Sequence, residues 1–325
     1  MAINKATAAA PVIWLLTDNK PGHRNQLKGL GDRLRVKAGA SLFWISAGEV
    51  KVPLWRALLA IPPALEGSLP RPDLIVAAGS GTHKLLLSLR RRARTLVLMK
   101  PGFPRRWVDA AIIPAHDGVS ANHNTLITEG VINSVTPVAH LPDKPEALML
   151  LGGPSPHFDW DDEAVFGQIT HLIENYPQWR WTISGSRRTP DALQSRLSDL
   201  SDPHITVEDP DKTPENWLSE RIAASRAIWV TPDSMSMVCE AATSGVPTGL
   251  FRLPERPRSR VASGVQRLVA MNYVARWDDH ATVMGAKAVP GRTLWEADRA
   301  AQWVIRRWLP ASSGNTQKSQ KRTNT

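Results

Sequence analysis

Short apolar runs alternate with amphipathic segments along the first part of this chain, and polar turns separate them. The runs are four to six residues long and rich in Val, Ile and Leu, which is typical of strands buried on both faces of a sheet. Alternation of such strands with helices predicts a parallel sheet covered on both sides. The predicted strands are Val12–Thr17, Leu42–Ser46, Asp73–Ala78, Thr95–Met99 and Ala110–Ile113, and the predicted helices are Arg24–Val36, part of Val52–Leu65 and Thr82–Arg92.

A second alternating pattern begins after a stretch that contains Pro137, Pro142 and Pro145. Because proline interrupts regular secondary structure, we interpret this stretch as a linker between two domains. Two successive doubly wound α/β domains predict a ligand cleft between them. The predicted strands of the second domain are Ala147–Leu151, Trp179–Ser184, Ile205–Val207, Ala227–Val230 and Thr248–Phe251, and the predicted helices are Asp161–Asn175, Pro190–Ser198, Glu215–Ala224, the segment after Ser234 and Thr293–Leu309.

The chain is therefore divided into a flexible tail (residues 1–10), an N-terminal domain (11–140), a C-terminal domain (141–292), a C-terminal helix (293–310) and a disordered polar tail (311–325). No apolar run reaches the ~18 residues of a transmembrane helix. The apolar run near the N-terminus is interpreted as the first strand, because Asp18 and Lys20 follow it directly. The single cysteine, Cys239, excludes an internal disulfide framework and favours a reducing compartment, so we expect a cytoplasmic location.

The excess of positive charge lies in the first half of the chain. Residues 1–145 contain 19 Lys and Arg against 9 Asp and Glu, whereas residues 146–325 contain 21 of each. This asymmetry favours an anionic partner, and a soluble basic face is the alternative. No nucleic acid is expected as a partner, because the basic residues are not interleaved with stacking aromatic residues. The candidates for contact with an anionic bilayer are Arg56, Arg90, Arg91, Arg92, Arg94, Arg105 and Arg106, with Trp55 and Trp107 as interfacial anchors.

The most informative segment is Thr231–Pro247, in which an apolar run stops at a polar turn and a helical pattern follows at once. The first backbone N–H groups of such a helix lack partners, so the turn forms a site for an anion such as a diphosphate. Ser236 and Glu240 share a helix face, which places Glu240 to accept hydrogen bonds from sugar hydroxyls. The alternative is a capped core helix, with Asp233 or Ser234 as the cap and Glu240 at the surface.

Two further turns of the second half have the same character. Gly152 and Gly153 would let the backbone approach a ligand closely. The turn Ser184–Pro190 combines hydroxyl groups with two arginines, whose guanidinium groups match phosphate geometry; paired arginines on a solvated surface are the alternative. Three such turns at strand ends together predict a diphosphate site. The donor-binding candidates are Gly152, Gly153, Ser155, Ser184, Ser186, Arg187, Arg188, Thr189, Asp233, Ser234, Met235, Ser236 and Glu240.

The first half supplies candidates for the acceptor side. A neutral His23 near the start of a helix could take a proton from an acceptor hydroxyl, and Asp18 could orient His23 or act as the base itself. A histidine that only caps the helix or bonds to the backbone is the alternative. The turn Gly79–Thr82 offers backbone amides for an anion or a sugar hydroxyl, and a plain tight turn is its alternative. The acceptor-side candidates are Lys20, Gly22, Gln26, Gly79, Ser80, Gly81, Thr82, Lys100 and His116.

No metal and no organic cofactor are expected. The sequence contains no H-E-x-x-H or C-x-x-C motif and no carboxylate cluster, so nothing in it proposes a catalytic metal. It also contains no Walker loop, no G-x-G-x-x-G and no G-x-S-x-G elbow. Two arginines and a helix N-terminus could neutralise a leaving diphosphate without a divalent ion.

The helix after the polar turn carries a pattern that resembles the donor site of the GT-B superfamily of nucleotide-sugar glycosyltransferases. The resemblance implies two Rossmann-like domains that face each other across a cleft, with the C-terminal helix packing back on the N-terminal domain. The similar residues are Asp233-Ser234, Glu240-Ala241, Gly245 and Pro247. The resemblance implies ribose binding by Glu240, phosphate binding by Ser186, Arg187, Arg188 and the Ser234–Ser236 amides, a place near the donor for Gly153, and a place near the acceptor for Pro21-Gly22-His23, which lacks the longer glycine run of membrane-surface members.

Over roughly residues 11–310 the chain also resembles the "elongated mitochondria" mitochondrial fission-factor family, which has plant and bacterial members. The biochemical activity of that family is poorly defined, so this resemblance implies the fold more firmly than the function. The motifs that carry it are Thr17–His23, Gly152–Ser155, Ser186–Pro190 and Pro232–Ser234.

The leading hypothesis is a metal-independent glycosyltransferase with a nucleotide-sugar as co-substrate and a cell-envelope saccharide or lipid-linked acceptor. The basic N-terminal domain would then lie on the cytoplasmic face of the inner membrane. One alternative is a nucleotide-sugar 2-epimerase, which needs acid and base carboxylates, whereas the first domain offers only Asp18 and Asp117 at strand ends. The other is a non-catalytic GT-B-like scaffold that acts through protein or membrane contacts.

Overall fold

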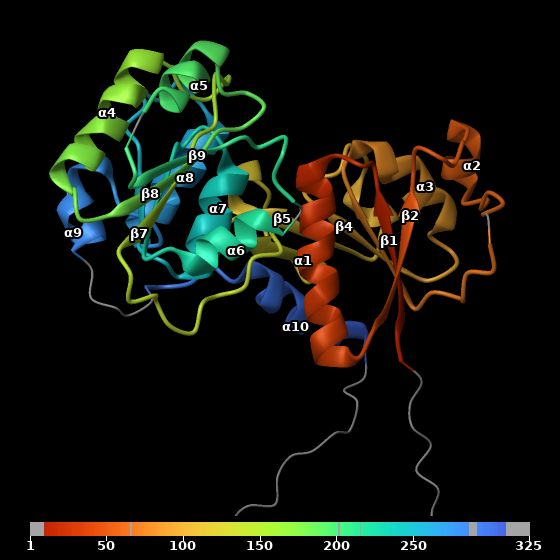
Figure 1. Cartoon of the computed structure of the whole chain (residues 1–325). Coiled ribbons are helices and arrows are strands. Elements are labelled where there is room, and N and C mark those ends of the chain that lie inside the picture. Colours follow the sequence, from red (N-terminus) through yellow and green to blue (C-terminus); the bar gives the residue numbers. More distant parts are fainter. Residues whose placement is uncertain (1–9, 66, 201, 215, 286–290, 310–325) are drawn as a thin grey trace, which may run out of the picture.

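Two α/β domains lie side by side in the computed structural model (Figure 1). The structure describes residues 10–65, 67–200, 202–214, 216–285 and 291–309. The predicted tails, residues 1–10 and 311–325, lie outside the described residues apart from Ala10. Each domain contains one parallel sheet, which confirms the doubly wound α/β fold that the alternating pattern predicts.

The N-terminal domain contains a six-stranded sheet in the order β2-β1-β3-β4-β5-β6. Its central strands are buried on both faces, since separate hydrophobic clusters cover the two sides. The sequence pattern does not predict the short β6 (Thr125–Thr128), because four residues between polar neighbours carry too little periodicity. The other elements are β1 (Val12–Thr17), α1 (Pro21–Ala38), β2 (Ser41–Ser46), α2 (Leu54–Leu59), β3 (Leu74–Ala78), α3 (His83–Leu89), β4 (Arg94–Leu98) and β5 (Ala110–Pro114), with short 3-10 helices η1 (Ser80–Thr82), η2 (Arg105–Trp107) and η3 (Ala115–Asp117).

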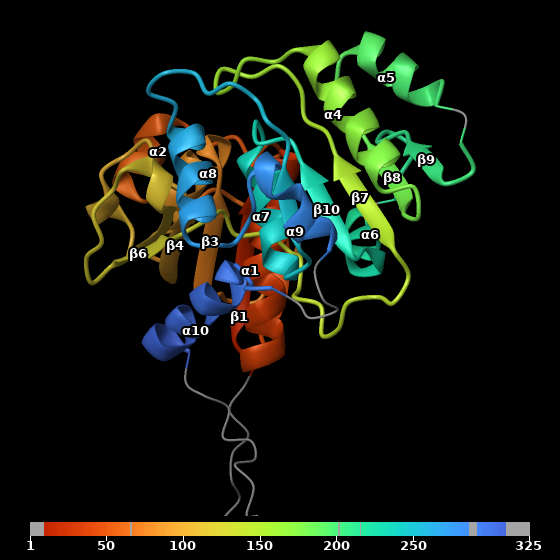
Figure 2. The same cartoon turned by 90° about the vertical axis from the view of Figure 1, so that its left-hand side faces the viewer.

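The C-terminal domain contains a five-stranded sheet in the order β11-β10-β7-β8-β9 (Figure 2). Its largest core side chains, Trp181 and Trp229, are fully buried. The elements are β7 (Glu146–Leu150), α4 (Asp162–Asn175), β8 (Arg180–Ser184), α5 (Asp191–Ser198), β9 (Ile205–Glu208), α6 (Trp217–Ala224), β10 (Ala227–Val230), α7 (Met235–Ser244), β11 (Thr248–Leu250), α8 (Arg260–Ala270), η4 (Trp277–Asp279) and α9 (His280–Met284).

The prediction omits α8 and α9, although the sequence contains a signal for α8. Ser259 caps α8, with the Ala262 amide donating to Ser259 Oγ at 3.1 Å. Ala262, Val265 and Leu268 then recur at helical spacing and are buried. The Pro- and Arg-rich stretch before Ser259 obscures this signal.

The strand order of each sheet reverses at one point. In the first sheet β2 lies on one side of β1 and β3 lies on the other, so the order reverses between β1 and β3. In the second sheet β8 lies on one side of β7 and β10 lies on the other, so the order reverses between β7 and β10. The loops after such a pair of strands diverge, and the crevice between them is where doubly wound sheets bind ligands. The glycine-rich and acidic turns singled out from the sequence follow these four strands.

The C-terminal helix α10 (Glu296–Trp308) lies on the N-terminal domain, as the GT-B resemblance implies (Figure 2). Ala297, Ala301 and Val304 of α10 belong to the same buried cluster as Leu27 and Leu30 of α1. The segment that follows the second domain in the sequence therefore completes the core of the first.

A buried carboxylate fixes the contact between α10 and α1. Asp298 of α10 lies 2.7 Å from an Nη of Arg33 and 3.1 Å from Nζ of Lys37, both on α1. Burial opposes the charge on Asp298, but hydrogen bonds from Lys37, Arg33 and Gln302 outweigh it, so the pKa of Asp298 lies below its usual value.

We expect Asp298→Asn to lower the free energy of unfolding by about 2 kcal/mol, because hydrogen bonds to a charged group are among the stronger ones. Urea denaturation at neutral pH measures this loss. Asp32→Asn is the matched control: Asp32 pairs with Lys28 at 3.0 Å, but its side chain is 36% exposed against 12% for Asp298. The control should cost less than about 0.5 kcal/mol. Equal losses in the two variants would contradict the assignment.

Candidate functional site

The crevices of the two sheets open into one cleft between the domains. The cavity there has a volume of about 380 Å³. The N-terminal domain lines it with His23, Gln26, Met99, His116 and Asp117. The C-terminal domain lines it with His157, Arg188, Asp233, Ser234, Ser236 and Arg260.

Asp18 and His23 form a hydrogen-bonded pair on the N-terminal wall. His23 Nδ1 lies 2.8 and 3.0 Å from the two carboxylate oxygens of Asp18. Burial opposes the charge on Asp18, but the hydrogen bonds from His23 and the Lys20 amide outweigh it and hold the pKa of Asp18 below its usual value. An ionised Asp18 can only accept, so the hydrogen bond requires a proton on Nδ1 of His23, and in the neutral form of the imidazole Nε2 is then the acceptor.

The glycine-rich turn after β3 closes over this pair. A Cβ at Gly79 would lie 2.2 Å from His23 Nδ1 and 2.4 Å from Asp18 Oδ2, and Gly79 has a φ of +90°. A Cβ at Gly81 would lie 2.8 Å from Asp18 Cβ. Thr82 Oγ1 donates to the Gly79 carbonyl at 2.7 Å and secures the turn. These glycines are therefore needed for the close approach of the two loops at the switch point.

A second aspartate has the corresponding place in the C-terminal domain. The side chain of Asp233, after β10, is 1% exposed and lies 2.7 Å from an Nη of Arg188. The Gly153 amide donates to the same carboxylate oxygen at 3.2 Å. A Cβ at Gly152 would lie 2.2 Å from this carboxylate, and one at Gly153 would lie 1.9 Å from the Arg188 carbonyl oxygen. The predicted glycine and arginine turns therefore meet around one buried charge.

The hydroxyl groups of the arginine turn brace these loops. Thr189 Oγ1 and Ser186 Oγ donate to the Gly152 carbonyl at 2.6 and 3.1 Å. Ser184 Oγ donates to the Gly185 carbonyl at 3.3 Å, and Ser155 Oγ accepts from the His157 amide at 3.2 Å. Of the donor-side candidates after β7 and β8, Arg188 lines the cleft, whereas Arg187 is exposed and does not.

The N-terminus of α7 opens directly into the cleft. Ser234, Met235 and Ser236 line the cavity, and Ser234, although it is the N-cap residue, makes no side-chain capping bond. Ser234 therefore leaves the first amides of α7 without a capping side chain among the described residues, and these amides are suited to an anion. The alternative of a capped helix with Glu240 at the surface is wrong, because Glu240 is 7% exposed.

Glu240 lies one turn into α7 and makes a contact between the domains. Asn25 Nδ2 of α1 donates to Glu240 Oε1 at 2.5 Å, and Asn25 Oδ1 accepts from the Ser134 amide at 3.1 Å. Burial raises the pKa of Glu240 to about 7, although the hydrogen bond from Asn25 works in the opposite direction. Glu240 is not among the residues that line the cavity.

The structure adds residues that the sequence prediction leaves out. Arg260, at the start of α8, lies 3.1 Å from Asp117 across the cleft and is 65% exposed. His157 Nδ1 lies 3.1 Å from Ser259 Oγ. The signal for Arg260 is its place just after the N-cap Ser259, whereas His157 lies in a loop without a local signal.

Of the acceptor-side candidates, Gly22, Gln26 and His116 line the cleft, whereas the exposed Lys20 and Lys100 do not. The Nδ1 atom of His116 is buried and has no hydrogen-bond partner among the described residues. Burial lowers the pKa of His116, and Arg260 and His157 act in the same direction against Asp117. His116 is therefore a neutral imidazole at neutral pH, with a polar atom available for a ligand.

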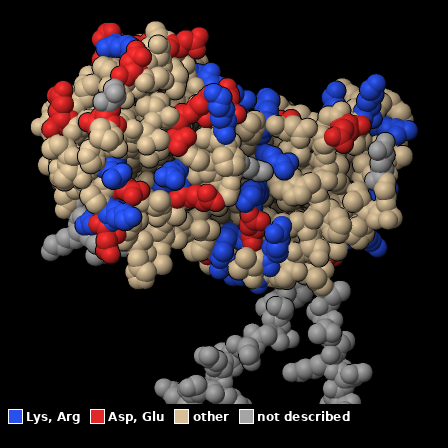
Figure 3. Space-filling model, viewed as in Figure 1, with Lys and Arg blue, Asp and Glu red and all other residues tan. Residues whose placement is uncertain are grey.

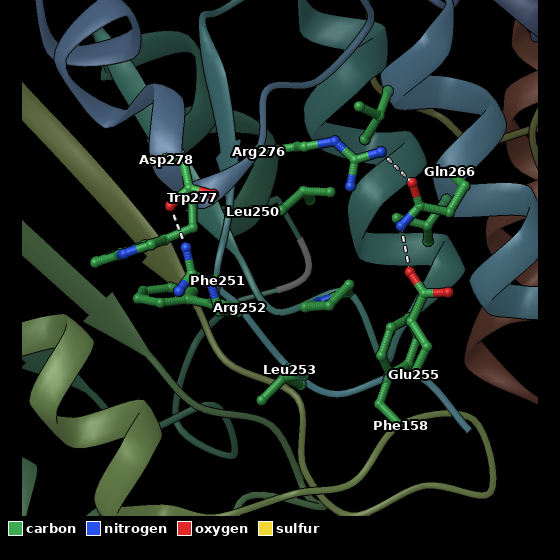
Figure 4. Close-up of a pocket in the computed structure, with 13 residues that line it drawn as sticks. Phe158, Leu250, Phe251, Arg252, Leu253, Glu255, Gln266, Arg276, Trp277 and Asp278 are labelled. Atoms are coloured by element: carbon green, nitrogen blue, oxygen red, sulfur yellow. Dashed lines mark hydrogen bonds and ion pairs between the residues drawn. The ribbon is translucent and has the colours of Figure 1, made fainter. Parts of the chain in front are cut away.

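A second, smaller cavity of about 130 Å³ lies within the C-terminal domain (Figure 4). Leu250, Phe251 and Trp277 form its apolar wall, and polar side chains link across its rim. Pro232 lines this cavity and Asp233 lines the cleft, so the two are neighbours along the loop after β10. The polar links are Arg276–Gln266, Gln266–Glu255 and Arg252–Asp278.

The described residues contain no group of three or more His, Cys, Asp or Glu that could hold a metal ion. None of the described helices combines the length and the apolar character that crossing a membrane requires.

This architecture is that of the GT-B glycosyltransferases and epimerases. A *Listeria monocytogenes* protein assigned as a UDP-N-acetylglucosamine 2-epimerase has a TM-score of 0.55 at 11% identity, covering 92% of this chain and 96% of that one. The *Methanocaldococcus jannaschii* UDP-GlcNAc 2-epimerase, solved with UDP-GlcNAc and UDP, has a TM-score of 0.50 at 13% identity, covering 92% and 100%. The glycotransferase of kitacinnamycin has a TM-score of 0.50 at 11% identity, covering 93% and 100%. At these identities the likeness concerns the fold.

The chain belongs to the Mitochondrial fission ELM1 family, whose model matches residues 21–308. It is also similar to the uncharacterized protein RP120 of *Rickettsia prowazekii* (strain Madrid E), at 22% identity over 349 residues, which covers 90% of this chain and 97% of that protein. The resemblance that the sequence motifs indicate is thereby confirmed for both the family and the fold.

We expect Glu240→Gln to remove a pH dependence of stability. Between pH 4.5 and about 7 the folded protein keeps the Glu240 proton that the unfolded chain releases, so wild-type stability falls as pH rises through this range. A pKa raised from 4.5 to about 7 corresponds to at most about 3 kcal/mol, lost above pH 7. The variant keeps an oxygen for Asn25 and should be more stable than wild type at pH 8 but similar at pH 5. Thermal unfolding at the two pH values measures this, and parallel pH profiles would refute it.

We expect Asp18→Asn to change the tautomer of His23. In the wild type the carboxylate holds the imidazole proton on Nδ1, whereas an amide can either accept or donate and allows a mixture of tautomers. Long-range ¹H–¹⁵N correlation spectra of the imidazole nitrogens report the tautomer directly. The exposed His204 serves as an internal control, and an unchanged His23 signal in the variant would show that Asp18 does not orient the ring.

Proposed function

We propose that this protein is a metal-independent glycosyltransferase that transfers a sugar from a nucleotide-sugar to a hydroxyl acceptor. The observation that carries the proposal is the meeting of two switch points in one cavity of about 380 Å³. One wall presents an imidazole backed by a carboxylate, and the other presents arginines and an uncapped helix N-terminus. This pairing suits removal of a proton on one side and departure of an anion on the other.

The donor diphosphate is proposed to bind at the N-terminus of α7, with Arg188 and Arg260 beside it. Unpaired amides and the helix dipole attract an anion, and guanidinium groups match phosphate oxygens. Arg188 forms an ion pair with Asp233, and this pair holds the Arg188 side chain at the cleft wall. Arg260 pairs with Asp117 on the opposite wall, so a bound diphosphate would compete for a guanidinium group that is already in place.

His23 is proposed as the general base. Its Nδ1 faces Asp18, so Nε2 is the nitrogen that would take the proton from the acceptor hydroxyl. As the acceptor oxygen bonds to the anomeric carbon, the bond from that carbon to the diphosphate oxygen breaks, and the acceptor proton passes to His23. The neutral His116, with its unpartnered Nδ1, is suited to bind a sugar hydroxyl.

The acceptor is proposed to be a cell-envelope saccharide or a lipid-linked saccharide. The support is the concentration of positive charge in the domain that holds His23, which favours a position on the anionic cytoplasmic face of the inner membrane. The epimerase alternative needs acid and base carboxylates, whereas the carboxylates of Asp18 and Asp117 are already paired, with His23 and Arg260 respectively.

The test is calorimetric titration with UDP-, GDP-, CMP- and ADP-sugars and with the free nucleoside diphosphates. We expect one nucleotide series to bind without added metal. Arg260→Ala should weaken binding of that series by about 10- to 100-fold, because a charged hydrogen bond to phosphate is lost. The exposure of Arg260 makes this variant safe for folding.

Arg187→Ala is the matched control, because Arg187 belongs to the same arginine turn as Arg188 but does not line the cleft. It should bind the nucleotide as the wild type does. His23→Ala should bind the donor and fail to transfer the sugar. Absence of binding by every nucleotide would favour the scaffold alternative, and wild-type affinity in Arg260→Ala would show that the diphosphate lies elsewhere.

A further inference from the structure

Most of the large hydrophobic side chains that are exposed in the described part of the chain lie in one short segment. Of the seven large hydrophobic side chains that are exposed in the described residues, five lie between positions 54 and 61. They are Leu54, Trp55, Leu58, Leu59 and Ile61, with exposed fractions between 38% and 60%. Figure 1 shows the helix of this segment, α2, at the end of the N-terminal domain that lies far from the C-terminal domain. A contiguous apolar patch of this kind marks an interaction surface.

The fold holds this segment in place with its apolar face outward. Ala57 and Ala60 are buried against the domain, whereas positions 54, 55, 58 and 59 form the opposite face of α2. Arg90 at the end of α3 donates to the carbonyls of Ala57 at 2.5 Å and Leu58 at 2.7 Å. Ala60 ends the helix with a φ of +55°. The patch is therefore built into the domain by specific contacts.

The surroundings of the patch are basic. Residues 50–65 and 79–95 contain no Asp or Glu. Lys51, Lys84, Arg91 and Arg92 are exposed, and the Arg56 guanidinium lies 5.4 Å from the centre of the Trp55 ring. In Figure 3 basic side chains gather at this end of the molecule beside one acidic cluster, whereas most of the acidic surface in that view covers the other domain. Two copies of such a surface would repel each other, and an anionic one would be attracted.

The structure also shows which of the arginines that the sequence groups together are already engaged in contacts within the protein. Arg90 is occupied by the carbonyls of α2, and Arg94 pairs with Asp109 at 3.0 Å. Arg105 donates to Thr125 Oγ1 at 3.0 Å. Trp107 is half-buried and stacks on Phe103, with 6.4 Å between the ring centres, so the surface aromatic of this region is Trp55.

The patch adjoins the loop that closes over the proposed base. A depression of about 450 Å³ lies between the start of α2 and the glycine turn after β3. Its lining combines two lysines with apolar side chains and includes Gly81, which packs against Asp18. The lining residues used here are Lys51, Val52, Pro53, Gly81, Lys84 and Leu85.

We propose that residues 50–61 dock this protein on an anionic phospholipid bilayer. Leu54, Trp55, Leu58 and Leu59 enter the interfacial region, while the lysines and arginines around them contact lipid phosphates. The depression beside α2 then leads from the bilayer surface toward Asp18 and His23. Entry of a lipid-linked acceptor along this path rests on the proposed glycosyl transfer, whereas the docking itself does not.

Co-sedimentation of the full chain with vesicles tests the docking. Vesicles of phosphatidylcholine with 30% phosphatidylglycerol should bind the protein at ~50 mM salt, and pure phosphatidylcholine vesicles should bind it at least about tenfold less. Raising the salt to ~500 mM should lower binding to the anionic vesicles by a similar factor, because screening removes the long-range attraction.

The decisive variant is the double substitution Leu58→Ser with Leu59→Ser, which alters exposed side chains and should leave the thermal midpoint unchanged. It should lower binding to anionic vesicles by at least about tenfold, since two apolar anchors are lost. Val36→Ser is the matched control, because Val36 is 69% exposed on α1 and lies outside the patch. Wild-type vesicle binding by the double variant, or equal binding to neutral vesicles, would overturn the proposal.

Sedimentation velocity tests whether a second copy of the chain binds the patch instead of a bilayer. A wild-type dimer at micromolar concentration that the double variant dissociates would show that the patch binds a second copy instead of a bilayer. Titration of the double variant with the nucleotide separates the two proposals. If the variant keeps its affinity for the nucleotide but no longer binds vesicles, the substitutions affect docking and not the nucleotide site. Vesicle binding without affinity for any nucleotide refutes the proposed transfer and leaves the docking intact.

Discussion

The cleft depends on a paired aspartate at the switch point of each sheet: Asp18, which is partly buried, and Asp233, which is buried. In the first domain Gly79 folds against Asp18, and in the second Gly152 folds against Asp233, each so closely that a side chain would clash. A buried carboxylate is costly unless it is paired, so each aspartate holds a neighbouring loop and a basic partner in one arrangement. The partner, His23 in the first domain, is thereby fixed at the surface of the cleft. Both walls of the site are built on the same constraint.

The sequence pattern locates these loops because their signals are local. Apolar runs that end in polar or glycine-rich turns identify every strand except the short β6 and, with the resemblance to GT-B proteins, the two-domain architecture. The sequence pattern does not reveal which turns meet, because 80 residues separate the Gly153 amide from the Asp233 carboxylate that accepts its hydrogen bond. The hydroxyl of Thr189 illustrates the difference: the sequence pattern makes Thr189 a donor-binding candidate, whereas in the structure its hydroxyl donates to the Gly152 carbonyl. The role of this hydroxyl depends on the strand order, which brings the loops after the neighbouring strands β7 and β8 together.

Arginine shows the same limit more sharply. A guanidinium group has five donors and binds whatever oxygens lie within reach, so its role depends on its surroundings and not on its neighbours in the sequence. Arg90 and Arg91 are adjacent, yet Arg90 holds the end of α2 and Arg91 is exposed. Arg260 lies in an unremarkable Pro- and Arg-rich stretch, yet the packing of α8 brings it to Asp117 in the other domain. A sequence signal can therefore mark the helix that carries Arg260 without indicating that Arg260 belongs to the site.

Glu240 connects this site to the relative position of the domains. In this structure its carboxyl is buried against Asn25, which is itself held by the Ser134 amide. Asn25 occupies only Oε1 of Glu240, so a ribose that used Glu240, as the GT-B resemblance implies, would either bind the other carboxyl oxygen or replace Asn25 as the partner. In the second case donor binding would break the contact between α1 and α7 that Asn25 and Glu240 make. A donor that binds better once this hydrogen bond is broken would shift the population toward that state only by its difference in affinity for the two states, because a ligand with equal affinity for both shifts neither.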